Sequence, residues 1–150
     1  MAIEGLFHFN INVRDLNRSI AFYETLGFQL QSQQDFVAPP GTETGMRIPG
    51  GHGRQAVMRI GSDPANPVLD MIEWQDAANA PAPYAGLTNI GIARIAFRTT
   101  GLRATYAHLK QAGVEFWSEP QEFPAGPGKV VYVIFADPDG TLLELIEFEA

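Results

Sequence analysis

Apolar and polar residues alternate strictly over residues 6–13, which is the pattern of a half-buried β-strand. One side of that strand carries Phe7, Phe9, Ile11 and Val13, and the other carries Leu6, His8, Asn10 and Asn12. The first side is the more apolar, so we expect it to lie under a helix. The histidine and the two asparagines are then left on the open face of a sheet.

The next residues follow a helical period. Asp15 is a suitable N-cap, apolar residues recur at helical spacing from Leu16 to Leu26, and Gly27 ends the helix because glycine adopts a left-handed conformation easily. Three more extended segments are predicted, at about 28–37, 54–61 and 67–74. The first part of the chain therefore has the order βαβββ.

The same order restarts after residues 75–86, an Ala- and Pro-rich segment without periodicity that we interpret as a linker. The predicted elements are a strand at 91–99, a helix at about 102–112 ended by Gly113, and strands at about 114–118, 128–136 and 141–149. Residues 137–140, Asp-Pro-Asp-Gly, are a turn signal that joins the last two strands.

The two parts of the chain are imperfect copies of each other. Shifting the sequence by 86 residues lays His8 over Arg94, and shifting it by 74 residues lays Asp70 over Glu144. Each copy puts one helix on one face of four strands and leaves the other face open. Two such units are expected to pair through their open faces.

The predicted fold is therefore α+β, with two tandem βαβββ modules that form a cleft between mixed β-sheets. The modules are residues 1–74 and 87–150, joined by the linker, and they make a single compact domain. Strand parity directs four ionisable side chains into the cleft, which are those of His8, Asp70, Arg94 and Glu144.

Composition excludes several classes of function. The net charge is −7, with only ten Lys and Arg residues, which argues against nucleic-acid binding. Cysteine is absent, so thiolate catalysis and zinc–thiolate sites are excluded. We see no signal sequence and no apolar run of about 18 residues, and we therefore expect a cytoplasmic protein without membrane partners.

With these elements in place, the chain resembles the vicinal oxygen chelate superfamily, which includes glyoxalase I, extradiol dioxygenases and the bleomycin-resistance proteins. The resemblance rests on residues 8–16, 19–23, 26–28, 109–114 and 135–147, and it spans nearly the whole chain. It implies a small organic ligand and a homodimer. It also implies four cleft residues that bind a divalent metal, at the positions of His8, Asp70, Arg94 and Glu144.

Arg94 does not fit that metal site, because a guanidinium stays protonated and has no lone pair to offer. In the interpretation we favour there is no cofactor, and Arg94 replaces the metal between Asp70 and Glu144. Alternatively His8, Asp70 and Glu144 hold a divalent Mn, Fe, Mg or Zn ion while Arg94 binds an anionic substrate. A fixed cation beside a metal ion is repulsive in a cleft of low dielectric, which weakens the second interpretation.

The favoured hypothesis is a lyase or isomerase. Arg94 would stabilise a developing enolate or carboxylate, His8 or Glu144 would move the proton, and Asp70 would complete the catalytic set. The residues expected to bind the substrate are Asn10, Trp74, Arg98 and Phe148. Two alternatives stay open, a non-catalytic protein that sequesters a drug or metabolite and a three-ligand metal-dependent dioxygenase or lyase.

Overall fold

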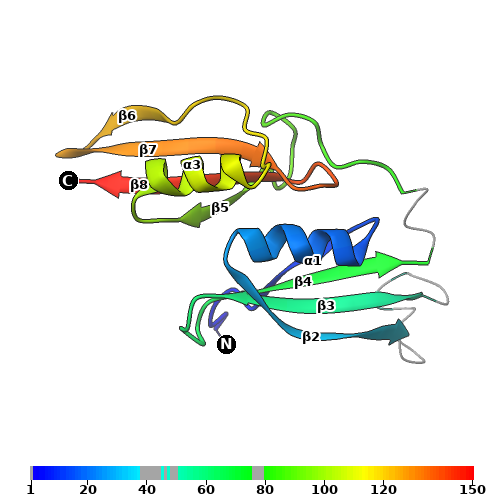
Figure 1. The fold of residues 1–150 in the computed structure, drawn as a ribbon. Helices are drawn as coiled ribbons and strands as arrows, with labels where there is room; N and C mark the ends of the chain where they lie inside the picture. The colour runs from blue at the N-terminus through cyan, green and yellow to red at the C-terminus, as the bar shows by residue number, and fades with distance from the viewer. Residues whose placement is uncertain (1, 38–44, 46, 48–50, 76–79) are drawn as a thin grey trace. The chain divides into compact units, whose positions relative to one another are not determined.

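The structure is a computed structural model that describes residues 2–37, 45, 47, 51–75 and 80–150. The chain divides into two compact units, Met1–Pro81 and Ala82–Ala150. Each unit contains a four-stranded sheet with a helix on one face (Figure 1). The predicted α+β fold of two tandem βαβββ modules is therefore confirmed.

Unit 1 contains one mixed sheet with the strand order β1-β4-β3-β2. Its elements are β1 (His8–Asn12), α1 (Leu16–Thr25), β2 (Phe28–Val37), β3 (His52–Ile60) and β4 (Val68–Trp74). β1 is parallel to β4, and the other neighbours are antiparallel. The first and last strands of the unit therefore lie side by side, with their side chains in register.

Unit 2 repeats this arrangement with the strand order β5-β8-β7-β6. Its elements are β5 (Ile95–Arg98), α3 (Leu102–Gln111), β6 (Gln121–Ala125), β7 (Gly128–Ala136) and β8 (Leu142–Glu149). β5 is parallel to β8, as β1 is to β4. The predicted turn at 137–140 connects β7 to β8, and the Asp137 carboxylate accepts hydrogen bonds from the backbone N–H groups of Asp139 and Thr141.

Each helix covers the apolar face of its own sheet. The core of unit 1 contains Leu16, Ile20 and Tyr23 of α1 together with Ala56, Met58 and Met71 of the sheet, all buried. The core of unit 2 contains Leu102, Tyr106 and Leu109 of α3 with Val131, Val133 and Leu143. The opposite face of each sheet carries no helix of its own unit among the described residues. Within those residues, no helix is long and apolar enough to span a membrane.

The helix ends follow the sequence signals. The Asp15 carboxylate accepts the N–H of Arg18 at 3.0 Å and caps α1. Gly27 and Gly113, which follow the two helices, have φ angles of 93° and 90°, the left-handed conformation expected of them.

The first strand of each unit is shorter than the alternation predicts. β1 begins at His8, so Phe7 precedes it, and Phe7 is 78% exposed rather than packed under α1. β5 begins at Ile95 instead of residue 91, which leaves Arg94 just outside it. The cause is the same in both units, because the parallel partner strands begin only at Val68 and Leu142 and offer no backbone groups further upstream.

The strand predicted at 114–118 is wrong. Phe116 alone bridges to Phe135, and the paired edge strand β6 starts at Gln121 opposite Tyr132. Between these two pairs the edge segment advances five residues while β7 advances three, so the edge segment carries two extra residues. Pro120 lies in this insertion, and it has no N–H to donate to a ladder.

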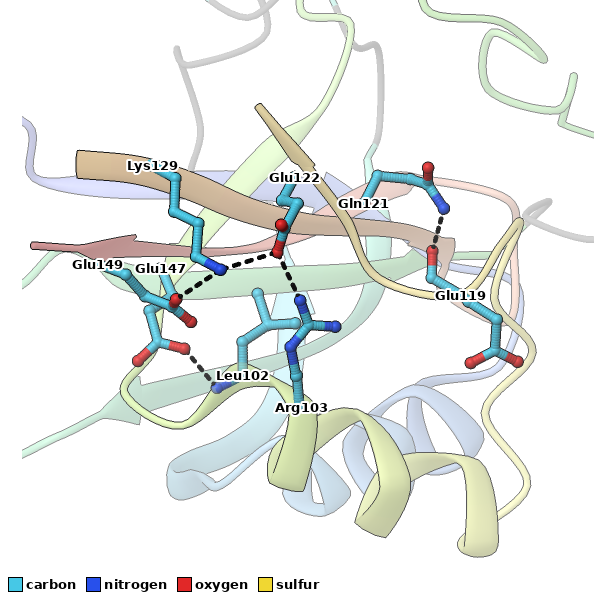
Figure 2. Close-up of polar contacts among 8 residues, drawn as sticks. All are labelled: Leu102, Arg103, Glu119, Gln121, Glu122, Lys129, Glu147 and Glu149. Atoms are coloured by element: carbon cyan, nitrogen blue, oxygen red, sulfur yellow. Dashed lines mark hydrogen bonds and ion pairs between the residues drawn. The ribbon is translucent and has the colours of Figure 1, made fainter. Parts of the chain in front are cut away.

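A glutamate near the end of the last strand of each unit binds the start of that unit's helix. Glu73 of β4 accepts the N–H of Leu16 at 2.6 Å and an Arg54 Nη2 hydrogen at 2.5 Å. Glu147 of β8 accepts the N–H groups of Gly101 and Leu102, both at 2.7 Å (Figure 2). The first N–H groups of a helix lack intrahelical partners, so these carboxylates fix each helix to its sheet.

The Glu147 contact predicts a pH dependence of stability. The N–H groups of Leu102 and Gly101 hold the pKa of Glu147 below its ordinary value of 4.5. A carboxyl whose pKa is lower in the folded state stabilises the fold above its unfolded pKa, and this contribution is lost as the pH falls through the folded pKa. Between about pH 6 and about pH 3 the melting temperature should therefore fall more in the unmodified protein than in Glu147→Gln.

Glu115→Gln is the matched control, because Glu115 is an exposed carboxylate of the same unit with no hydrogen bond among the described residues. It should melt in parallel with the unmodified protein across the same pH range. Parallel curves for Glu147→Gln as well would show that the cap contributes nothing.

Candidate functional site

The open face of the unit 1 sheet places Asp70 among neutral amides. Asp70 of β4 lies directly across from Asn10 of β1 in a parallel pair, so both side chains point to the same face. The Asn10 Nδ2 group donates to Asp70 Oδ2 at 3.2 Å, and Gln55 Nε2 donates to Oδ1 at 2.8 Å. Both carboxylate oxygens are thus bound by neutral donors, and among the described residues no cation pairs with Asp70.

The amide network continues along the same face. Gln34 Nε2 donates to Gln55 Oε1 at 3.1 Å, and the Trp74 indole N–H donates to Asn12 Oδ1 at 2.8 Å. The face therefore presents hydrogen-bonding groups beside one indole ring. Asn10 and Trp74, which the sequence proposes as ligand-binding residues, lie on it as strand parity predicts.

The predicted catalytic histidine is exposed. His8 begins β1, and its ring centroid lies 5.2 Å from that of Phe7. It lies on the same face as Asp70, one side-chain step from Asn10, but no hydrogen bond joins it to another described residue. His52, expected in a hairpin loop, is instead the first residue of β3, because it pairs with Val37 of β2.

The open face of unit 2 carries an ion pair between Arg94 and Glu144. The pair consists of one hydrogen bond of 2.5 Å from Arg94 Nε to Glu144 Oε2. Glu144 lies on β8 directly across from Ala96, and Arg94 is one side-chain step from Ala96 on the neighbouring segment. The repeat that lays Arg94 over His8 thus identifies a residue that contacts a site carboxylate.

The two members of this pair differ sharply in exposure. The Glu144 side chain is 5% exposed and the Arg94 side chain is 40% exposed. Arg94 contacts the carboxylate only through Nε, so neither Nη group has a protein partner within the described ranges. A guanidinium has five N–H donors, and four of them are therefore available to a ligand.

The far end of the same face is aromatic. The guanidinium carbon of Arg98 lies 5.7 Å from the centre of the Phe148 ring and over its face. Phe148 is 62% exposed, and Phe123 of the adjoining edge strand is 50% exposed. The ligand contacts proposed for Arg98 and Phe148 are thus possible, because both side chains reach solvent on the open face.

The carboxylates do not fit a metal ion in this arrangement. Glu144 already accepts a charged donor, and both oxygens of Asp70 accept amide hydrogens. Nowhere in the described part of the chain do three or more His, Asp or Glu side chains form a group that could hold a metal. A bound divalent ion would have to displace the Arg94 side chain from Glu144, so we derive no reaction step through a metal.

The structure joins the proposed site residues within each unit only. Asn10 contacts Asp70 in unit 1, and in unit 2 Arg94 contacts Glu144 and Arg98 contacts Phe148. The convergence of His8 and Asp70 with the unit 2 pair stays a prediction. Of the residues expected to determine specificity in 36–53, those at 38–44, 46 and 48–50 lie outside the described residues.

Sequence reasoning missed Gln55 and the two helix-capping glutamates. Gln55 binds Asp70 because β3 runs antiparallel to β4 and places residue 55 next to Val57, the direct partner of Asp70, on the same face. Strand pairing has to be known for that inference. Glu73 and Glu147 do carry a signal, since they match each other under the shift of 74 residues.

Comparisons with known proteins agree with this arrangement. The profile of the Glyoxalase/Bleomycin resistance protein/Dioxygenase superfamily matches residues 5–145. Virulence protein STM3117 of Salmonella typhimurium is 25% identical over 150 residues, which are 99% of this chain and 87% of the relative.

Two solved structures illustrate the likeness of fold. A glyoxalase family protein from Bacillus cereus has a TM-score of 0.81 at 14% identity, covering 100% of this chain and 97% of that one. A glyoxalase I variant from Zea mays has a TM-score of 0.67 at 22% identity, covering 95% of this chain and 44% of that one. The family profile spans both βαβββ modules, and the chain therefore belongs to the Glyoxalase/Bleomycin resistance protein/Dioxygenase superfamily.

Proposed function

We propose that this chain binds a small organic oxyanion on the open face of unit 2 and catalyses a lyase or isomerase reaction without a metal. The observation that carries the proposal is the single-point contact of Arg94 with Glu144, which leaves both Nη groups of an exposed guanidinium free among the described residues. Planar guanidinium groups bind carboxylates and enolates through paired N–H donors.

In this reaction Arg94 stabilises the negative charge that develops on a carbonyl oxygen when a neighbouring proton leaves. Donors that are already oriented toward that oxygen lower the barrier without reorganisation. Glu144 is the proton carrier that lies nearest to Arg94, since the pair is in direct contact. His8 is the alternative carrier, as an exposed imidazole with no hydrogen bond in the described part of unit 1.

Sequestration of a ligand without chemistry is the second candidate. The exposed aromatic side chains of Phe148 and Phe123 favour it, because apolar surface on an open sheet face is typical of a site for an apolar ligand. The homodimer expected from the family resemblance stays a prediction.

The test uses a panel of 2-oxo and 2-hydroxy carboxylic acids with the unmodified protein, Arg94→Gln and Arg103→Gln. Arg103 belongs to an exposed ion pair with Glu122 on the outer side of unit 2, so its variant controls for the lost charge (Figure 2). Calorimetry should show binding that falls about tenfold in Arg94→Gln, equivalent to one charge-assisted hydrogen bond, and does not change in Arg103→Gln.

Proton NMR in D2O then separates the two candidates. Loss of the signal from the carbon next to the carbonyl, at a rate that depends on the protein, supports catalysis. Ligand that binds through Arg94 and is recovered without exchange or conversion supports sequestration. Equal binding by the unmodified protein and Arg94→Gln would overturn both.

A further inference from the structure

All but one of the basic residues in unit 2 have a carboxylate partner. Unit 2 contains five basic residues, Arg94, Arg98, Arg103, Lys110 and Lys129. Arg103 pairs with Glu122 at 2.7 Å, Lys110 with Glu119 at 3.1 Å, and Lys129 with Glu122 at 3.0 Å. Figure 2 shows how Glu122 and its two cations join α3 to the outer strands. With Arg94 bound to Glu144, only Arg98 has no carboxylate partner among the described residues.

Phe148 holds the Arg98 guanidinium without using any of its donors. The guanidinium carbon lies over the ring at 5.7 Å from the centroid, a cation–π contact. Such a contact uses the face of the guanidinium, and its N–H groups point outward in the plane. Arg98 is also exposed, so these donors can reach a ligand.

Arg94 and Arg98 lie on the same face and are separated by an apolar step. Ala96 lies between them in sequence, and Ile146 of β8 lies directly across from Arg98. Four residues of extended chain span about 13 Å, which sets the separation of the two Cα atoms. The face carries two arginines and one glutamate, a net charge of +1, whereas unit 2 as a whole has five basic and eight acidic residues, a net charge of −3.

We propose that the ligand of unit 2 is an elongated organic dianion. One anionic group binds the Nη donors of Arg94, an apolar middle lies over Ala96 and Ile146, and the second anionic group binds Arg98. This inference rests on the proposed function, because it assigns the first anionic group to Arg94. Phe148 is a positioning residue that orients the second cation.

The spacing of the two cations makes ligand length a criterion of selection. A short dianion reaches one arginine only, and a long monoanion leaves Arg98 without a partner. When both groups bind, the second contact forms within the same complex and therefore adds affinity efficiently. The expected ligand class is thus chains with an acidic group at each end rather than compact diacids.

The test measures affinity by calorimetry for straight-chain α,ω-dicarboxylates from butanedioate to dodecanedioate, each compared with the monocarboxylate of equal length. Affinity should rise with the length of the dicarboxylate to a maximum, and at that length it should exceed that of the monocarboxylate about tenfold. Arg98→Gln should remove this advantage and leave monocarboxylate binding unchanged. Arg103→Gln, which removes the same charge elsewhere in the unit, should keep the advantage.

The outcomes separate this inference from the proposed function. Arg94-dependent monocarboxylate binding with no dicarboxylate advantage, or with an advantage that survives Arg98→Gln, overturns the dianion and leaves the proposed function standing. Monocarboxylate binding that does not depend on Arg94 overturns the proposed function instead. Phe148→Leu should reduce the dicarboxylate advantage without changing monocarboxylate affinity, which a loss of folding would not do.

Discussion

Replacing Arg94 by alanine is expected to lower the free energy of unfolding by about 2 kcal/mol. The reason is Glu144, whose side chain is 5% exposed and which would lose the guanidinium that compensates its charge. Removing one partner from a fully buried ion pair costs about 3–5 kcal/mol. The Arg94 side chain is 40% exposed, and solvent screens the pair enough to place the loss below that range.

Urea denaturation of three variants measures this loss and its cause. Arg94→Ala with Glu144→Gln in the same chain should recover most of the lost stability, because a buried amide needs no counterion. Arg103→Ala should change stability little, since both members of its ion pair are largely exposed. A double variant no more stable than Arg94→Ala alone would show that the loss comes from packing rather than from an uncompensated charge.

Periodicity predicts the elements of this fold well and their ends less well. The alternation that begins at His8 and the helical spacing that follows Leu16 identify β1 and α1, because side-chain direction repeats every two residues in a strand and about every 3.6 in a helix. Strand ends depend on the partner strand instead. Arg94 was therefore placed in a strand whose parallel neighbour begins too late to pair with it.

The candidate site divides along the same line. The repeat and strand parity suffice to predict that Arg94 and Glu144 share a face, and the structure joins them by a hydrogen bond. The Gln55–Asp70 contact requires the pairing of β3 with β4, and the sequence alone does not contain that register. The Arg98–Phe148 contact likewise depends on side-chain conformations, which parity leaves open.

Glu144→Gln is expected to separate anion binding from proton transfer. Glutamine keeps the size of the side chain and removes its charge, so Arg94 loses its counterion and becomes a stronger binder of anions. Affinity for a 2-oxo carboxylate such as 2-oxobutanoate should rise severalfold. A positioned general base contributes about 10²–10⁴-fold to a rate, so exchange of the ligand's protons with D2O should slow by about that factor if Glu144 carries the proton.

Calorimetry and NMR on the same samples give the two quantities independently, and their combination assigns the role of Glu144. Tighter binding with slower exchange identifies a base, because a purely structural counterion would raise the affinity without slowing the exchange. Tighter binding with unchanged exchange would move the proton carrier to His8, which His8→Gln then tests. Weaker binding in Glu144→Gln would contradict the premise, since it would mean that Glu144 orients Arg94 for the ligand more than it neutralises its charge.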